Sequence, residues 1–179
     1  KSKKLVLDYI KELYKKFRII IIDNSNDLDL KSIIINSYPG VEIYLIPNNG
    51  YSNQINFGSK LVTTEYFLIS NPDIRGMNET NVLNFVKAAK ELKNKFSALG
   101  PRFLNVNPKS HKQSEDNKSI SSMKFISGAC MFFNKKNFDS LNGFDENIFL
   151  YFEENDFCFR SYKVNKNYQL NNIKIEHDI

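Results

Sequence analysis

The stretch EYFLISNPDI, residues 65–74, decides how the chain folds, because a strand pattern in it ends at a turn that carries one carboxylate. Its first six residues, rich in aromatic and branched side chains, predict a strand. Pro72 follows, and proline fixes its own backbone angle φ and donates no hydrogen bond to a sheet. We therefore expect a sharp turn that presents Asp73 at the carboxyl end of the strand.

Strands alternate with helical patterns on both sides of this stretch. Before it, we expect a helix over 4–16, strands over 17–23 and 41–47 with a helix over 28–36 between them, and a helix that follows a glycine turn within 48–62. After it, we expect a helix over 78–95 capped by Asn78, a strand over 123–133, a helix from about 153 and a strand over 168–177. The FRIIIID run of 17–23 is continuously apolar, which predicts a parallel strand buried on both faces.

This βαβα order predicts an α/β fold with a doubly wound sheet, whose ligands bind beyond the carboxyl ends of the strands. Asp23 and Asp73 both follow such ends. With 179 residues, 41% of them hydrophobic, residues 1–179 are expected to form one domain. Because the chain starts with Lys1 rather than Met, we expect a processed or excised piece, truncated at both ends. The polar segment 105–119 predicts a mobile loop, either a functional lid or plain disorder.

Composition argues against several classes of protein. No apolar run approaches the ~20 residues that span a bilayer and no signal-peptide pattern is present, so we expect a cytoplasmic protein. Cys130 and Cys158 lack zinc-site spacing and are expected to be reduced core thiols. The net charge of +5 suits an anionic partner. The lysines are spread over many helices rather than clustered with aromatic residues, which argues against nucleic acid.

Three acids, Glu153, Glu154 and Asp156, enter the first turn of the helix expected near the C-terminus. The helix dipole stabilises acids at such a position without any catalytic role, and Asp156 is spaced to pair with Arg160. The aromatic residues in 149–152 favour catalysis instead, because apolar surroundings raise the pKa of a carboxylate, which can then act as a base.

Several stretches, in this order, resemble the inverting glycosyltransferases of family 2, in particular their rhamnosyltransferase-like branch. They are IIIIDNS (19–25), NNGYSNQINFG (48–58), NPD (71–73) and the long, most specific block SGACMFFNKKNFDSLNGFDENIFLYFEENDFCFR (127–160). The resemblance implies a GT-A-like fold, a doubly wound and mostly parallel sheet flanked by helices. It also implies that this chain lacks the first strand of the family.

The resemblance implies a donor site at the strand ends. There NPD is similar to a reduced DxD motif, with Asp73 as ligand of Mg²⁺ or Mn²⁺, a hard cation that offsets charge on the leaving diphosphate. His177 is similar to a further metal ligand, but a lone histidine near a terminus commonly has no such role. The residues that the resemblance assigns to the nucleotide are Asp23, Asn24, Gly50, Asn56 and Asn71. A plain strand-to-helix turn is the alternative for the first two, and a helix-surface position is the alternative for Asn56.

By the same resemblance, the acidic block serves the acceptor. Glu154 is similar to the general base, at a position where the family more often has Asp, and in-line attack on the donor implies inversion. Glu153 and Asp156 would orient the acceptor or the helix, with Arg160 holding Asp156. Gly128 would line the acceptor cleft.

The implied activity is transfer of rhamnose or another hexose from a dTDP- or UDP-sugar to a hydroxyl of a glycan or lipid-linked acceptor, in surface polysaccharide synthesis. A lipid-linked acceptor would bring the protein to the inner face of the membrane as a peripheral protein, with which the basic charge is compatible. The alternative is a catalytically inactive relative that binds a sugar nucleotide or a glycan.

Overall fold

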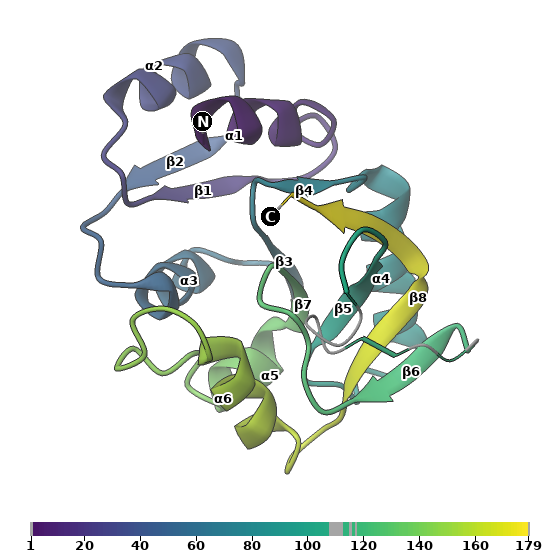
Figure 1. Ribbon diagram of the computed structural model, residues 1–179. Coiled ribbons are helices and arrows are strands. Elements are labelled where there is room, and N and C mark those ends of the chain that lie inside the picture. The colour runs from purple at the N-terminus through teal and green to yellow at the C-terminus, as the bar shows by residue number, and fades with distance from the viewer. Residues whose placement is uncertain (1, 108–112, 115, 117, 179) are drawn as a thin grey trace.

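The computed structural model describes residues 2–107, 113, 114, 116 and 118–178, which alternate between helices and strands (Figure 1). In chain order the elements are α1 (Ser2–Lys11), β1 (Ile20–Asp23), α2 (Leu28–Ser37), β2 (Glu42–Leu45), α3 (Tyr51–Lys60), β3 (Tyr66–Ser70), β4 (Ile74–Arg75), α4 (Glu79–Glu91), β5 (Leu99–Phe103), β6 (Ile120–Met123), β7 (Cys130–Asn134), α5 (Lys135–Ser140), α6 (Glu153–Ser161) and β8 (Asn167–His177). The α/β class expected from the sequence is confirmed. Among these helices, none is both long and apolar enough to cross a bilayer.

A small lobe is formed by β1 and β2, which pair in parallel with Ile20 opposite Glu42. Helices α1 and α2 cover one face of this pair, and α3 lies on the other side (Figure 1). The α2 helix begins where the side chain of Asp27 accepts a hydrogen bond from the Leu30 amide, a typical N-cap. The lobe therefore has the layered arrangement of a βαβ unit.

A mixed sheet of six strands forms the larger part of the molecule. Its order is β3-β7-β5-β8-β4, with β6 on β8. β5 and β8 are parallel, whereas β3 and β5 each pair antiparallel with β7, and β4 and β6 each pair antiparallel with β8. The long strand β8 thus holds together strands from both halves of the sheet.

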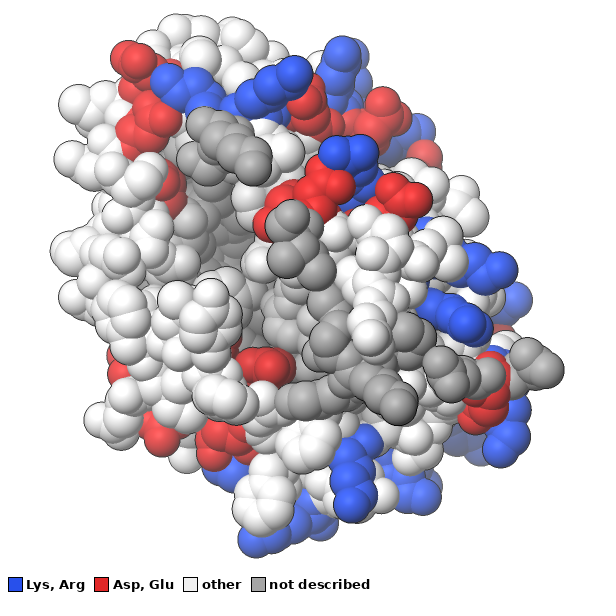
Figure 2. Space-filling view, viewed as in Figure 1, with Lys and Arg blue, Asp and Glu red and all other residues white. Residues whose placement is uncertain are grey.

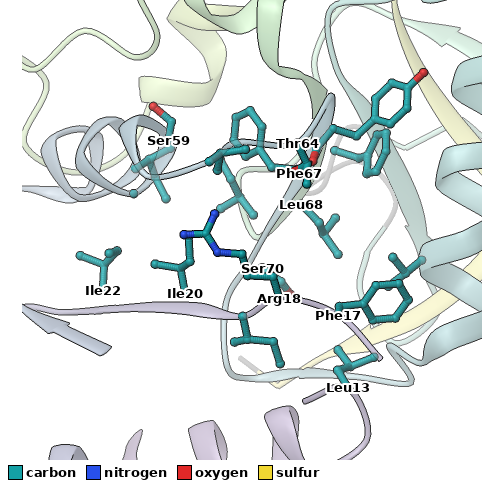
Figure 3. Close-up of a pocket in the computed structure, with 18 of the residues that line it drawn as sticks. Leu13, Phe17, Arg18, Ile20, Ile22, Ser59, Thr64, Phe67, Leu68 and Ser70 are labelled. Atoms are coloured by element: carbon teal, nitrogen blue, oxygen red, sulfur yellow. The ribbon is translucent and has the colours of Figure 1, made fainter. Parts of the chain in front are cut away.

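A cavity of about 570 Å³ separates the two sheets. Residues of β1, β3, α1 and α3 line it, and we call it the β1–β3 cavity. In the view of Figure 1, this face of the molecule is hollowed beneath the β1–β2 lobe, and Lys and Arg are spread over its margins (Figure 2). Ile20 and Ile22 of β1 and Leu68 of β3 are among the side chains drawn around the cavity (Figure 3).

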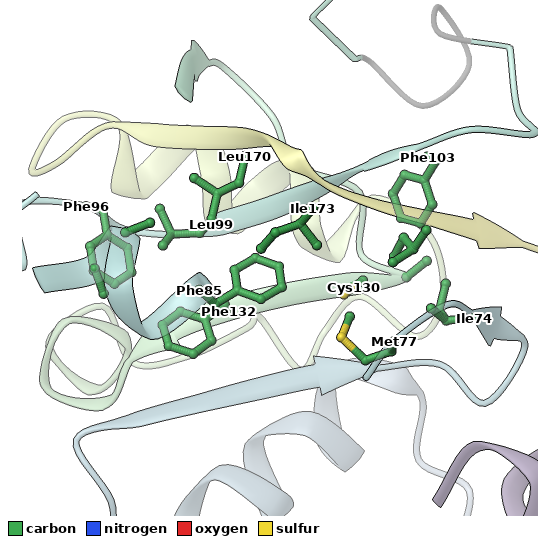
Figure 4. Packing of buried hydrophobic residues seen from close by; sticks show 14 of the residues in the cluster. Ile74, Met77, Phe85, Phe96, Leu99, Phe103, Cys130, Phe132, Leu170 and Ile173 are labelled. Carbon is green, nitrogen blue, oxygen red and sulfur yellow. The ribbon is translucent and has the colours of Figure 1, made fainter. Parts of the chain in front are cut away.

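The core of the larger sheet is centred on Phe132 in β7, which is 2% exposed (Figure 4). Its ring centroid lies 5.2 Å from that of Phe85 in α4 and 5.4 Å from that of Tyr66 in β3, and both pairs are stacked. On the opposite face of β7, Phe133 packs against Phe157 of α6 with centroids 5.2 Å apart. Alternation along one strand therefore joins α4 and α6 to the same sheet.

Most of the expected elements are present, and three differ. The helix expected over 4–16 ends at Lys11, and turns occupy the residues that follow. The single strand expected over 123–133 is two strands, β6 and β7, because the intervening residues turn and Gly128 lies in that turn. The strand expected to be buried on both faces, β1, is only half-buried along its whole length, because one of its edges borders the β1–β3 cavity.

Of the loop expected over 105–119, residues 108–112, 115 and 117 lie outside the described part. Gln113 exchanges hydrogen bonds with the backbone of Phe103, and Asn171 donates one to the carbonyl of Lys118. These contacts tie the described ends of the segment to β5 and β8. Cys130 and Cys158 are both buried thiols, as expected.

The Phe132 contacts lead to a stability prediction. Phe132→Ala should lower the free energy of unfolding by about 3–5 kcal/mol, because it opens a cavity between α4 and the sheet. Urea unfolding followed by circular dichroism measures this loss. The control is Leu83→Ala on the outer face of α4, where Leu83 is 52% exposed and a change within about 0.5 kcal/mol is expected. Equal losses in the two variants would contradict the central place of Phe132.

Candidate functional site

The turn after β3 brings Asp73 next to His177. β4 follows the turn at once and pairs with the end of β8, so that Ile74 lies opposite His177. Asp73 Oδ1 lies 3.3 Å from His177 Nε2. Asn105 holds the histidine backbone from the other side, since it accepts from the His177 amide and donates to the His177 carbonyl. Two residues over a hundred positions apart thus form one pair.

The carboxylate of Asp73 has capacity left for a cation. Its Oδ1 atom is buried and, apart from the approach of His177 Nε2, meets no donor among the described residues. A buried acceptor in this state costs free energy unless a charge or a donor meets it. Within the described part of the chain, no group of three or more His, Cys, Asp or Glu side chains is placed to hold a metal by itself. Asp73 and His177 therefore fit a metal that takes its other ligands from water and a bound phosphate group.

Tyr51, the first residue of α3, links this turn to the next segment of the site. Its hydroxyl donates to the carbonyl of Gly128 at 3.0 Å and lies 3.3 Å from Oδ1 of Asn71. Burial raises the pKa of Tyr51, and the negative charges of nearby groups, Glu153 first, raise it further. The phenol therefore stays protonated and can donate its one proton to the Gly128 carbonyl, the shorter of the two contacts.

The start of α6 places two adjacent glutamates in different surroundings. A Cβ added at Gly128 would lie 3.4 Å from Cβ of Glu154, so the two residues lie within van der Waals reach of each other. Glu153 is 5% exposed, and its Oε2 atom has no hydrogen-bond partner among the described residues. Burial raises the pKa of Glu153, and the charge of Glu154 adds to this rise. The first glutamate is therefore the buried one, and the second is half-buried beside Gly128.

The segment that leads into α6 has a strained backbone. Tyr151 and Phe152 have φ angles of 66° and 71°, a left-handed conformation that bulky residues rarely adopt. Both side chains are 71% exposed. Gly50, with φ of 95°, supports this segment, because a Cβ there would lie 2.5 Å from the carbonyl oxygen of Phe149. Strain of this kind persists where surrounding contacts enforce it, and it gathers at functional sites.

Asp23 and Asn24 lie at the carboxyl end of β1 and make local contacts. Oδ1 of Asp23 accepts from both the amide and the hydroxyl of Ser25, and Oδ2 accepts from the amide of Asp27. The side chain of Asn24 donates to Asn48 at 2.9 Å. These contacts have the geometry of the strand-to-helix turn that the sequence left as an alternative.

Asn56, Asp156 and Arg160 secure the loop between α5 and α6. Asn56 is 7% exposed, accepts from the amide of Phe144 and donates to its carbonyl. Arg160 donates to Asp156 and to the carbonyls of residues 141 and 143. The helix-surface position considered for Asn56 is wrong, because this loop covers it. Its expected contact with a nucleotide has no support here either, because the loop already uses both ends of its amide.

The structure therefore gathers one subset of the expected residues. The hydroxyl of Tyr51 contacts Asn71 and Gly128. The charges of Glu153, Glu154 and Asp73 raise the pKa of Tyr51. Asp73 is in turn paired with His177. Asp23 and Asn24 lie apart from Tyr51, at the end of β1. Asn56, Asp156 and Arg160 hold the loop between α5 and α6. Tyr51 was not predicted as a site residue, and its one signal in the sequence is that it directly follows the glycine turn that starts α3.

The comparison with protein families decides the identity of this arrangement. Residues 3–164 match the model described as Glycosyl transferase family 2. The chain belongs to this family. A curated protein to which it is similar is the low-salt glycan biosynthesis hexosyltransferase Agl10 of Haloferax volcanii, with 24% identity over 187 residues. That alignment covers 88% of this chain and 59% of the relative, so the chain spans less than two thirds of the relative's length.

Solved structures of longer glycosyltransferases have the same fold. The mannosyltransferase PcManGT of Pyrobaculum calidifontis, in complex with GDP-Man and Mn²⁺, superposes with a TM-score of 0.78 at 12% identity, over 98% of this chain and 53% of that one. TarS 1-349 of S. aureus, in complex with UDP-GlcNAc, gives a TM-score of 0.74 at 14% identity, over 97% and 54%. The expected GT-A-like fold of this family 2 member is confirmed.

The buried carboxyl of Glu153 makes the stability of this family 2 chain depend on pH. Because the pKa of Glu153 is raised above its ordinary value of 4.5, the folded chain binds the proton more tightly than the unfolded chain. The free energy of unfolding therefore falls as pH rises from the ordinary pKa through the raised one, and stays lower above it. Glu153→Gln should remove this fall and exceed the original chain in stability by on the order of 1 kcal/mol at about pH 8.

Urea unfolding at a series of values between about pH 4 and about pH 8 tests this. The control is Glu12→Gln on the exposed surface near the N-terminus, which should retain the fall. If the free energy of unfolding of Glu153→Gln falls with pH as much as that of the original chain, the carboxyl of Glu153 is not the cause of the fall.

Proposed function

We propose that the chain carries the catalytic part of a glycosyltransferase that moves a hexose from a nucleoside-diphosphate sugar to a hydroxyl of a glycan or lipid-linked acceptor. The observation that carries this proposal is the convergence on Tyr51 of the Asp73 turn and the Glu154 helix start. A carboxylate with room for a cation and a second carboxylate suited to act as a base are the two groups that such a transfer needs.

On the donor side, Asp73 and His177 would hold a divalent metal, Mg²⁺ or Mn²⁺. The metal would neutralise charge on the leaving diphosphate. Related structures with this fold were determined with GDP-Man and Mn²⁺ and with UDP-GlcNAc, which supports a nucleotide-sugar donor. Asp23, Asn24 and Gly50 follow the ends of β1 and β2, where ligands of such sheets bind, and would face the nucleoside.

On the acceptor side, Glu154 would take the proton from the attacking hydroxyl. The oxygen of that hydroxyl then bonds to the anomeric carbon while the bond from this carbon to the diphosphate oxygen breaks. The attack comes from the face opposite the leaving group, so the anomeric configuration inverts. No acid is needed for the leaving group, because a diphosphate leaves without protonation when its charge is offset.

The exposed aromatic residues before α6 would contact the acceptor. Phe149, Tyr151 and Phe152 are each more than half exposed and directly precede the glutamates. Aromatic side chains offer a large apolar area for sugar rings or lipid chains. If the acceptor is lipid-linked, the reaction would take place at the cytoplasmic face of a membrane, where the net charge of +5 favours anionic headgroups.

Donor binding is the first test. Titration of UDP, dTDP and GDP into the protein by calorimetry, with and without Mn²⁺, should give binding of one nucleotide that requires the metal. Asp73→Asn should weaken that binding at least ~10-fold, because it removes the charged ligand. Asp139→Asn, an exposed acid on α5, is the matched control. Equal binding by Asp73→Asn and Asp139→Asn would contradict the donor role of Asp73.

Turnover tests the base. Glu154→Gln should lower kcat by about 10²–10⁴-fold with the donor dissociation constant unchanged, because the proton acceptor is lost while the donor site is kept. Release of the nucleoside diphosphate in the presence of an acceptor measures this. Glu91→Gln, an exposed glutamate of α4, is the control. Unchanged turnover in Glu154→Gln would contradict the assignment, and donor binding without turnover in the original chain would favour the inactive relative considered above.

A further inference from the structure

The outer side of α6 and the segment before it expose much apolar surface. Among the described residues, most of the large apolar side chains that are exposed fall within 149–164. They are Phe149, Leu150, Tyr151, Phe152, Phe159, Tyr162 and Val164. Exposed apolar surface that is concentrated in one place marks contact with a protein, a ligand or a membrane.

Helical spacing places three of these side chains along one side of α6. Phe152 directly precedes the helix, Phe159 follows it by seven residues, and Tyr162 comes three residues later. Phe157 and Cys158 lie on the opposite side, where they are fully buried against the sheet. A helix with apolar side chains on both sides is commonly covered on both. The outer side of α6 therefore has the character of a contact surface.

A positive charge accompanies this apolar stripe. Lys163 Nζ lies 5.3 Å from the centroid of the Phe159 ring, a cation–π distance. No Asp or Glu occurs over 157–175. Asp156, the last acid before that stretch, is ion-paired with Arg160. The C-terminal end of α6 thus combines aromatic side chains with uncompensated positive charge.

Two more segments bring lysines to the same end of the helix. The carbonyl of Lys166 accepts a hydrogen bond from the amide of Ser97, so the segment that contains Lys95 lies beside the turn after α6. The carbonyl of Lys124 accepts one from the side chain of Asn167. All three lysines are exposed, and Lys and Arg side chains gather along the lower margin of Figure 2, next to α6. This gathering is not visible in the sequence, where the lysines are spread over many segments.

The composition of this surface favours a lipid bilayer over other partners. We call it the α6 patch, and it consists of Lys95, Lys124, Phe159, Tyr162, Lys163, Val164 and Lys166. Lysine is depleted at protein–protein interfaces, whereas lysine next to aromatic and apolar side chains is typical of helices that lie in a membrane surface. Tyrosine concentrates at the level of the headgroups, and the long lysine side chain reaches from apolar surroundings to anionic groups.

We propose that the α6 patch docks the protein on a bilayer that contains anionic lipids, with α6 lying along the membrane surface. The aromatic segment 149–152, at the other end of α6, then lies at the level of the headgroups. An acceptor anchored in the bilayer can reach Glu154 there without leaving the membrane surface. The docking rests on the α6 patch alone, and only this choice of a lipid-linked acceptor rests on the proposed function.

Tryptophan fluorescence tests the docking, because the chain contains no tryptophan. Phe159→Trp places one reporter in the patch. Leu83→Trp is the matched control, since Leu83 is also exposed but lies on α4, on the opposite face of the sheet. The vesicles contain phosphatidylcholine with brominated acyl chains and about 30% phosphatidylglycerol. We expect the Phe159→Trp emission to shift to shorter wavelength and to be quenched at least ~2-fold, and the Leu83→Trp emission to stay unchanged.

Co-sedimentation with the same vesicles measures the affinity, without nucleotide, metal ion or acceptor. Lys163→Gln combined with Lys166→Gln should weaken binding at least ~10-fold, because both lysines attract anionic headgroups. Lys87→Gln combined with Lys90→Gln, on exposed positions of α4, is the control and should bind as the original chain does.

Two results would overturn the proposal: no binding of the original chain to the vesicles, or equal effects of the α6 and α4 variants in both measurements. A single-stranded oligonucleotide that binds through Lys163 and Lys166 while the vesicles do not bind would overturn it as well, since the partner would then be a nucleic acid. Because the vesicle measurements contain no nucleotide, their outcome is independent of the donor titration, and either proposal can fail without the other.

Discussion

One buried hydroxyl, that of Tyr51, connects the parts of the candidate site. It contacts Asn71 next to the Asp73 turn and the carbonyl of Gly128, against which Glu154 packs. The residue before it, Gly50, has a left-handed φ and no space for a side chain, because the backbone of Phe149 fills that space. The start of α3 therefore sets how far the Asp73 turn, the entry to β7 and the aromatic segment lie from one another.

Elements with a regular local pattern could be predicted from the sequence. The Asn78 cap of α4 is one case, since its side chain accepts from the amide of Asn81 as N-cap asparagines do. The turn at Pro72 is another, because proline imposes it locally. β5 could not be predicted: its sequence LGPRF contains Gly and Pro, and its register against β8 shifts at Pro101. Only the partner strands reveal that these residues are a strand.

The sequence indicated which residues belong to the candidate site, but it did not indicate which of them are buried or which contact one another. The acids at the start of α6 stand out in the sequence, and the pairing of Asp156 with Arg160 follows from helical spacing. The two glutamates lie near Gly128 and influence the pKa of Tyr51, and both of these residues are distant in the chain. The sequence therefore does not show which glutamate is buried. The covered position of Asn56 depends on a loop almost ninety residues away. Local patterns contain no information about such contacts.

The strand β8 lies outside the part of the chain that matches the family model, although it is central to the larger sheet. The match to family 2 covers residues 3–164 and stops before β8 begins. Yet β8 pairs with β4, β5 and β6, and its last residue, His177, faces Asp73. Residues outside the matched part of the chain therefore supply both a central strand of the sheet and the partner of Asp73. A change confined to this last strand would consequently alter the partner of Asp73 while the segments that match the family model stay the same.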